Sequence, residues 1–246
     1  MTSAPTPTAG GREAPLARWP FWRANANRWP PRRVWESDDD AALVLTDRAR
    51  GAMLVGLGAP RPLARLLTGA EAPAVDRALL TRGTWALLPD DVRRRTGLRA
   101  GPFWDWLSTT ADPPRRDGED RVVPLSGGAE QAHALLARAY PDRGTHADDA
   151  ALDWWAYPGR GGAPVAVLAA HRPASGAPVH LSAVGVLPEH RRQGIAATLV
   201  AAVTRRALRE APMVHLGIWA DSDDARRLYT RLGFATGHRV ESLARA

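Results

Sequence analysis

The segment 184–200, VGVLPEHRRQGIAATLV, constrains the fold more than any other part of the chain. It predicts an apolar strand, a short polar loop and then a helix that begins at once, which is an α/β arrangement. The first turn of a helix leaves backbone N–H groups without partners, and the helix dipole favours negative charge there. Gly194 and Ala196 are small enough to let a phosphate approach that turn. The segment therefore predicts an anion site, although a glycine at such a turn is as often purely structural.

Two amino-acid types are missing, because the chain has no cysteine and all 33 of its basic residues are arginine. The absence of cysteine excludes disulfides, thiolate metal sites and a cysteine nucleophile. The absence of lysine excludes Schiff-base chemistry and a P-loop lysine. Any bound phosphate must therefore be held by arginine or by backbone amides, and we expect no metal site.

The formal net charge of +7 is spread almost evenly over the two halves of the chain. Acidic residues interrupt the short arginine clusters, so the pattern favours a solvated surface over a nucleic-acid partner. No apolar run is long enough to cross a membrane. Residues 1–18 lack the features of a signal peptide, and their Pro, Thr, Ala and Gly content predicts a disordered leader. We therefore expect a cytoplasmic protein with no membrane and no nucleic-acid partner.

Composition along the chain predicts two domains. The apolar-poor segment Thr109–Asp120, with its paired prolines, separates a domain at 19–115 from a domain at 121–246. The Trp-rich segment 19–35 predicts an ordered arm without a regular helix, because its prolines interrupt one. The rest of the first domain predicts strands within 41–57 and at 84–89, and helices at 60–69, 72–83 and 90–97.

The second domain has a clearer order of elements. It predicts a strand, a helix, three strands, a helix, a strand, a helix and a final strand, which is an α/β class. Within the first of these helices, 129–140, four apolar side chains share one face and predict packing against a sheet. These four are Ala132, Leu135, Leu136 and Ala139.

Two motifs in this domain resemble the GNAT acetyltransferase family. RRQGIA at 191–196 matches the family's loop pattern Arg/Gln-x-x-Gly-x-Gly/Ala, and ARRLYTRLGF at 225–234 matches its terminal helix and following strand. The resemblance implies a mixed, mostly antiparallel sheet flanked by helices over roughly 121–240. The layout of 19–115 is also similar to two-domain members whose N-terminal half is a degenerate copy.

The resemblance implies acetyl-CoA as co-substrate and no metal. The backbone of Val184, Gly185 and Val186 would pair with the pantetheine arm like an added strand. Ser222 stands where many members have Asn, so it is expected to cap the terminal helix and bond the cofactor less extensively. The pyrophosphate would be held by Arg191, Arg192, Gln193, Gly194, Ile195 and Ala196.

Tyr229 is the first candidate catalytic residue. When an amine attacks a thioester, a thiolate leaves, and a phenol within hydrogen-bond reach can protonate it. The resemblance implies this role of general acid for Tyr229, and the alternative is a tyrosine that only packs under the cofactor.

His180 is the second candidate, as the base that removes a proton from the amine. Strand alternation places His180, Ser182, Val184 and Val186 on one face. The run is similar to the arylalkylamine acetyltransferase version of the motif, which has two strand histidines; His180 matches the first, and Ser182 replaces the second. The alternative is a surface histidine at the start of a strand.

These features predict an N-acetyltransferase that moves acetyl from acetyl-CoA to a primary amine by direct attack in a ternary complex. The acceptor could be a small metabolite, an antibiotic or a peptide N-terminus, and the enzyme a monomer or homodimer. The alternative function is a non-catalytic acyl-CoA-binding module. An aromatic acceptor site built from Trp22, Trp104 or Trp155 is a further hypothesis from the ten tryptophans.

Overall fold

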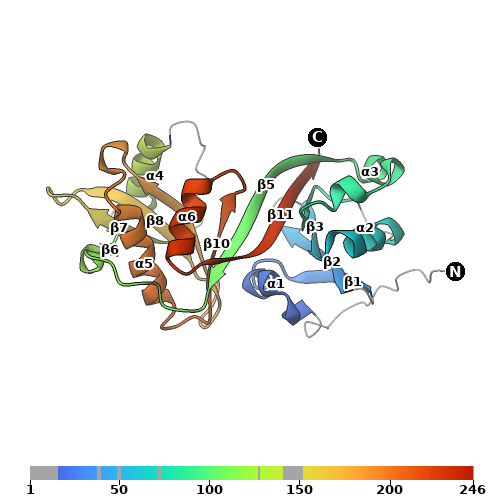
Figure 1. Cartoon of the computed structure of the whole chain (residues 1–246), viewed down its shortest axis with the longest axis horizontal. Coiled ribbons are helices and arrows are strands. Elements are labelled where there is room, and N and C mark those ends of the chain that lie inside the picture. The colour runs from blue at the N-terminus through green and yellow to red at the C-terminus, as the bar shows by residue number, and fades with distance from the viewer. Residues whose placement is uncertain are drawn as a thin grey trace. The chain divides into compact units, whose positions relative to one another are not determined.

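The computed structural model describes residues 16–37, 40–48, 51–70, 74–126, 128–140 and 152–245 (Figure 1). Contacts divide the chain into two compact units. The first takes the described residues up to Trp106 together with Ile218–Asp221 and those from Thr236 onward, and the second takes Leu107–Gly217 and Ser222–Ala235. Throughout those ranges, every helix is too short or too polar to cross a membrane. Each unit is made of more than one stretch of the chain, whereas each domain predicted from the sequence is one continuous stretch.

The first unit is built on a sheet with the strand order β1-β2-β3-β4-β11-β5. Strands β1 to β3 form an antiparallel meander, β3 pairs with β4 in parallel, and β11 pairs with β4 antiparallel. The strands are β1 (Pro31–Ser37), β2 (Ala41–Arg48), β3 (Gly51–Gly58), β4 (Arg77–Thr81), β5 (Leu98–Thr109) and β11 (Ala235–Arg245). The helices are α1 (Pro20–Asn25), α2 (Pro60–Gly69) and α3 (Asp90–Thr96), with short 3-10 turns at Leu16–Arg18 and Trp85–Leu87.

A leucine-rich face of α2 and one valine of α3 belong to the hydrophobic core of this unit. Leu63, Leu66 and Leu67 of α2 are buried, as is Val92 of α3. On α1, the ring of Phe21 contacts three tryptophans and stacks on the ring of His238 at 4.7 Å. Burial lowers the pKa of His238 to about 4, so this histidine stays neutral at physiological pH and acts as an aromatic core residue.

The second unit is built on the strand order β10-β9-β8-β7-β6. Its pairs are antiparallel except β9 with β10, which is parallel. The strands are β6 (Val123–Pro124), β7 (Leu152–Pro158), β8 (Pro164–His171), β9 (Val179–Val186) and β10 (Val214–Trp219). The helices are α4 (Gly128–Ala139), α5 (Ile195–Ala207) and α6 (Asp223–Arg231), with 3-10 turns at Glu119–Arg121 and Pro188–His190.

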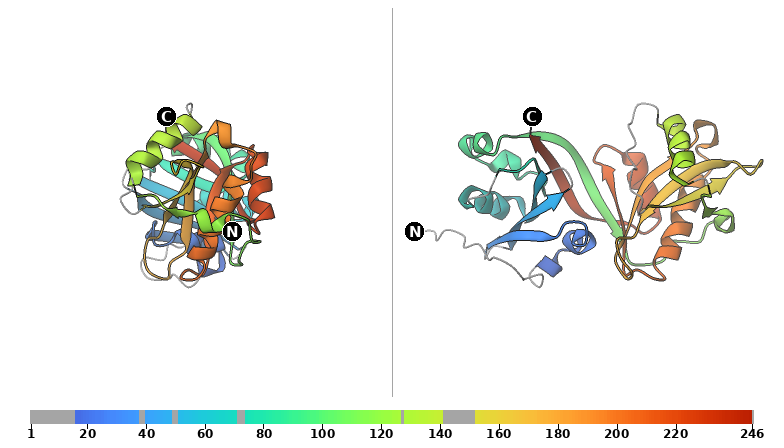
Figure 2. Two further views of the ribbon diagram at one scale, coloured as in Figure 1. Left: turned by 90° about the vertical axis from the view of Figure 1, so that its left-hand side faces the viewer. Right: turned by 180° about the vertical axis from the view of Figure 1, so that it is seen from behind.

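Helices α4 and α5 cover opposite faces of this sheet (Figures 1 and 2). The four apolar residues predicted to form one face of α4 are all buried, which confirms the predicted helix and its orientation. Helix α5 is buried along nearly its whole length, because its small and β-branched residues lie directly on the strands. The sheet thus presents the turn between β9 and α5 at one edge of the unit.

Several local predictions are wrong, most of them in the first unit. Residues 72–83 were expected to be a helix, but Arg77–Thr81 forms strand β4, because pairing with β3 and β11 outweighs local propensity. Residues 84–89 form a 3-10 turn, and the Trp-rich arm contains helix α1, whose Pro20 occupies a first-turn position that tolerates proline. Of the predicted leader, 1–15 lies outside the described residues, and Leu16 is fully buried.

Candidate active site

The turn between β9 and α5 has the backbone of an anion site. Arg192 and Gly194 both adopt positive φ, 62° and 79°, and Gly194 is the N-cap of α5. Alternating backbone handedness of this kind turns successive N–H groups toward one point. Among the described residues, no side chain makes a capping hydrogen bond at this helix end. A Cβ at Gly194 would contact Arg116 at 3.5 Å and nothing nearer, so a ligand has room to approach.

The side chain of Arg191 donates hydrogen bonds to backbone carbonyls of the protein. Its Nη2 donates to the Ala139 carbonyl at the end of α4 (2.6 Å), and its Nε donates to the Val186 carbonyl (3.3 Å). Its guanidinium also lies 5.8 Å from the ring centroid of Tyr140. Arg191 therefore ties the loop to α4, and its backbone N–H is also used within the protein, because it donates to the Pro188 carbonyl at 3.2 Å.

Arg116 is a residue that sequence reasoning missed. It is exposed, and its Nη2 is the nearest atom to the position of a Cβ at Gly194. It lies 78 residues before Gly194 in a segment that the sequence identifies only as a boundary, so no local pattern could have placed it at the loop. Arg116 brings a positive charge to the N-terminus of α5.

A partly buried ion pair holds the segment that carries Arg116 against α5. Arg205 of α5 binds Glu119 (Nε–Oε2, 3.1 Å), Asp112 and the Pro113 carbonyl. Burial by itself raises the pKa of the Glu119 carboxyl, but hydrogen bonds from Arg205 and from the Arg116 amide outweigh it and lower that pKa. Glu119 is therefore ionised at neutral pH. It bonds both to Arg205 of α5 and to the Arg116 amide of its own segment, so it attaches the segment to α5.

Strand β9 contains a β-bulge. Val167 of β8 lies opposite Gly185 and Ala169 lies opposite Ser182, so β9 has one residue more than β8 over this interval. Ala183, inside the bulge, has a φ of 51°. The extra residue reverses the alternation, so His180 and Ser182 share a face with Gly185, and Val186 points to the opposite face. The prediction that His180 and Val186 share one face is wrong for this reason.

Strands β9 and β10 part immediately after they begin to pair. Their register comprises Val179 with Val214 and His180 with His215, and it ends there. The remaining backbone of β9, including Val184, is therefore not paired with β10. The Val184 carbonyl instead accepts a hydrogen bond from the Tyr140 hydroxyl (3.1 Å). An extended ligand could add to β9 along this opening.

Tyr229 of α6 is buried, and its ring packs edge-on against Phe234 at 5.7 Å. Burial, with a smaller contribution from nearby Tyr140, raises the pKa of its hydroxyl well above the usual range. The group therefore stays protonated at neutral pH. Tyr140, whose hydroxyl binds the Val184 carbonyl at the opening in β9, is thus near enough to Tyr229 to affect its pKa.

The remaining predicted site residues have mixed outcomes. Ser222 is the N-cap of α6, but its side chain makes no capping hydrogen bond, contrary to expectation. Trp22 is 2% exposed and Trp104 donates to Ser242, so Trp22 is a core residue and Trp104 part of the first unit's interior packing. Trp155 lies under the guanidinium of Arg206 at 4.9 Å. The first two tryptophans thus belong to the packing of the first unit, and Trp155 belongs to the second unit. Among the described residues there is no cluster of metal ligands.

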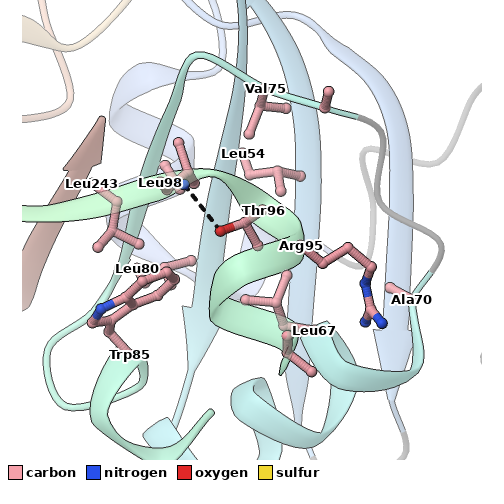
Figure 3. A pocket seen from close by; sticks show the side chains of 13 residues that line it. Leu54, Leu67, Ala70, Val75, Leu80, Trp85, Arg95, Thr96, Leu98 and Leu243 are labelled. Carbon is pink, nitrogen blue, oxygen red and sulfur yellow. Dashed lines mark hydrogen bonds between the residues drawn. The ribbon is translucent and has the colours of Figure 1, made fainter. Parts of the chain in front are cut away.

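The core of the first unit contains a cavity of about 270 Å³ (Figure 3). Its walls are aliphatic side chains and Trp85, with Arg95 and Thr96 as the polar members. The Thr96 hydroxyl is engaged, because it accepts from the Leu98 amide at 3.2 Å. The described residues of the lining include no carboxylate and no histidine, the usual acids and bases of group transfer.

Comparison with known proteins now identifies the second unit. Residues 129–234 match the Acetyltransferase (GNAT) family. The chain contains a GNAT acetyltransferase domain. A GNAT-family protein from Novosphingobium aromaticivorans superposes with a TM-score of 0.56 and 21% identity over 95% of this chain and 100% of its own. A GCN5-related N-acetyltransferase from Kribbella flavida gives 0.54 and 22% identity, over 96% of each chain. No curated protein matches the chain.

The GNAT domain confirms the predicted fold class, a mixed α/β fold with a mostly antiparallel sheet flanked by helices. Membership implies acyl transfer from acyl-CoA to an acceptor. The loop at Gly194 and the opening along β9 both lie within the matched residues, as does Tyr229.

Proposed function

We propose that the protein transfers acetyl from acetyl-CoA to a primary amine by direct attack in a ternary complex. The observation that carries this proposal is the parting of β9 from β10 in line with the anion loop at Gly194. Pantetheine would pair with the backbone of Val184 to Val186, which is not paired with β10, after displacing the Tyr140 hydroxyl. The pyrophosphate would meet the amides of 192–196 and the side chain of Arg116.

The chemistry is a pair of proton transfers around one acyl exchange. The amine nitrogen forms a bond to the acetyl carbon, and the bond from that carbon to sulfur breaks. The proton leaving the nitrogen goes to Nε2 of His180, and the hydroxyl proton of Tyr229 goes to the thiolate sulfur. Transfer of the proton from His180 to the Tyr229 phenolate through water restores both groups and balances the reaction.

Released CoA can be measured without interference from the protein. The chain has no cysteine, so a thiol-trapping dye reports only the CoA thiol. Acetyl-CoA is incubated with small amines, aminoglycosides and peptides with free N-termini, and turnover with at least one primary amine is expected. Tight binding of acetyl-CoA with no turnover on any amine would instead support the alternative function, a non-catalytic acyl-CoA-binding module.

A further inference from the structure

Two histidines from neighbouring strands meet where β9 and β10 part. Nδ1 of His180 lies 3.4 Å from Nδ1 of His215, and the ring centroids are 4.8 Å apart with planes inclined at 47°. His215 is 1% exposed, whereas His180 is partly exposed. The pair is thus an inner ring that is almost fully buried and an outer ring that can reach a ligand.

The distance between the two Nδ1 atoms limits the protonation pattern. A hydrogen bond between them needs a hydrogen on one Nδ1 and a lone pair on the other. If His180 is the donor, its Nε2 has a lone pair and can accept a proton. If His215 is the donor, Nε2 of neutral His180 carries the hydrogen, and His180 cannot act as the base through that atom.

We propose that His215 is a positioning residue that accepts a hydrogen bond from Nδ1–H of His180 and thereby holds Nε2 of His180 as the base. This inference rests on the proposed function and adds a residue to it. A proton taken up at Nε2 makes His180 cationic, and its Nδ1–H then donates a charge-assisted bond, which is stronger than the neutral one. Since His215 is buried, water competes little for its ring nitrogen.

The strand pairing places this pair of histidines at the opening in β9. His180 and His215 are the last residues in register before the strands separate, so they close the end of the opening proposed for the acyl donor. The sequence has Ser182 where a second strand histidine could stand, and His215 supplies a second imidazole from 35 residues further along the chain. Two backbone strands fix the pair, so its geometry does not depend on a flexible loop.

The kinetic test compares two substitutions at His215. His215→Phe fills the site without a hydrogen-bond acceptor, and it should lower kcat about 10- to 100-fold with both KM values within about threefold. His215→Asn offers a side-chain oxygen to Nδ1–H of His180 and should recover kcat to within about fivefold of the natural protein. His133→Gln is the matched control, because His133 is partly buried in α4 against Trp154, outside the proposed machinery.

Equal losses of kcat in the two variants, or a normal kcat in His215→Phe, would overturn the inference. A tautomer measurement keeps the inference testable if His215→Phe does not fold. Nitrogen-15 NMR of the histidine-labelled natural protein, assigned with His180→Gln, should show the hydrogen of His180 on Nδ1. A hydrogen on Nε2 would contradict the inference. Absence of turnover in the natural protein would defeat the proposed function and leave this NMR result standing.

Discussion

Arg116→Gln tests whether an arginine far from the loop in sequence helps to bind the donor's pyrophosphate. The substitution removes the positive charge near Gly194 and keeps a polar side chain of similar reach. It leaves the Arg116 backbone N–H, which donates to Glu119 at 2.7 Å, so the segment stays attached to α5. The change therefore isolates the guanidinium.

The expected magnitude follows from distance and exposure. Two unit charges about 4 Å apart attract by about 1 kcal/mol in water and about 4 kcal/mol near a protein surface. Arg116 is exposed, so the lower figure applies to each phosphate charge, and ordering the long side chain cancels part of the gain. A net loss of about 1 kcal/mol corresponds to about a fivefold rise in KM for acetyl-CoA, with kcat unchanged.

The assay compares two acetyl donors. With acetyl-CoA, Arg116→Gln should raise KM about fivefold, and the effect should shrink at high salt because the charges are screened. With acetyl-pantetheine, which lacks the pyrophosphate, the variant should behave like the natural protein. Arg115→Gln, a neighbouring exposed arginine, is the matched control and should leave KM for both donors unchanged. An equal rise in KM for both donors, or the same rise in Arg115→Gln, would refute the reasoning.

Three further outcomes are expected. Tyr229→Phe should lower kcat about 100-fold or more while KM for acetyl-CoA changes less than about threefold, and an unchanged kcat would remove Tyr229 from the mechanism. Glu119→Gln should lower Tm at pH 7 by several degrees. Because folding lowers the pKa of Glu119, this difference in Tm should shrink as the pH falls below about 4. A difference in Tm that stays constant with pH would contradict the pairing of Glu119 with Arg205. Ala78→Val, in the cavity lining, should raise the free energy of unfolding by about 1 kcal/mol in urea melts, whereas Ala42→Val, buried on β2 outside that lining, should lower it.

Local patterns predicted the elements whose residues interact with near neighbours in the chain. The amphipathic face of α4 was identified because a helix brings residues three and four apart to one side. The turn at Gly194 was identified because a strand, a small residue and a helix N-terminus follow one another directly. Strand β4 was missed because its partners, β3 and β11, lie far away in sequence.

The bulge at Ala183 shows a different limit. Alanine has no preference for a positive φ, so the local sequence does not predict the extra residue in β9. The bulge nevertheless decides which side chains share a face with His180, and so it corrected the predicted site.

By itself, the sequence determined which chemical groups this protein has: no thiol, no lysine amine, a glycine-containing loop before a helix at Gly194 and a tyrosine at 229. Only the tertiary structure decided which groups meet those residues. Arg116 reaches the loop and His215 reaches His180 because strand pairing and ion pairs join segments that are 78 and 35 residues apart. Contacts at such separations depend on how the whole domain packs, and short-range sequence patterns do not predict them.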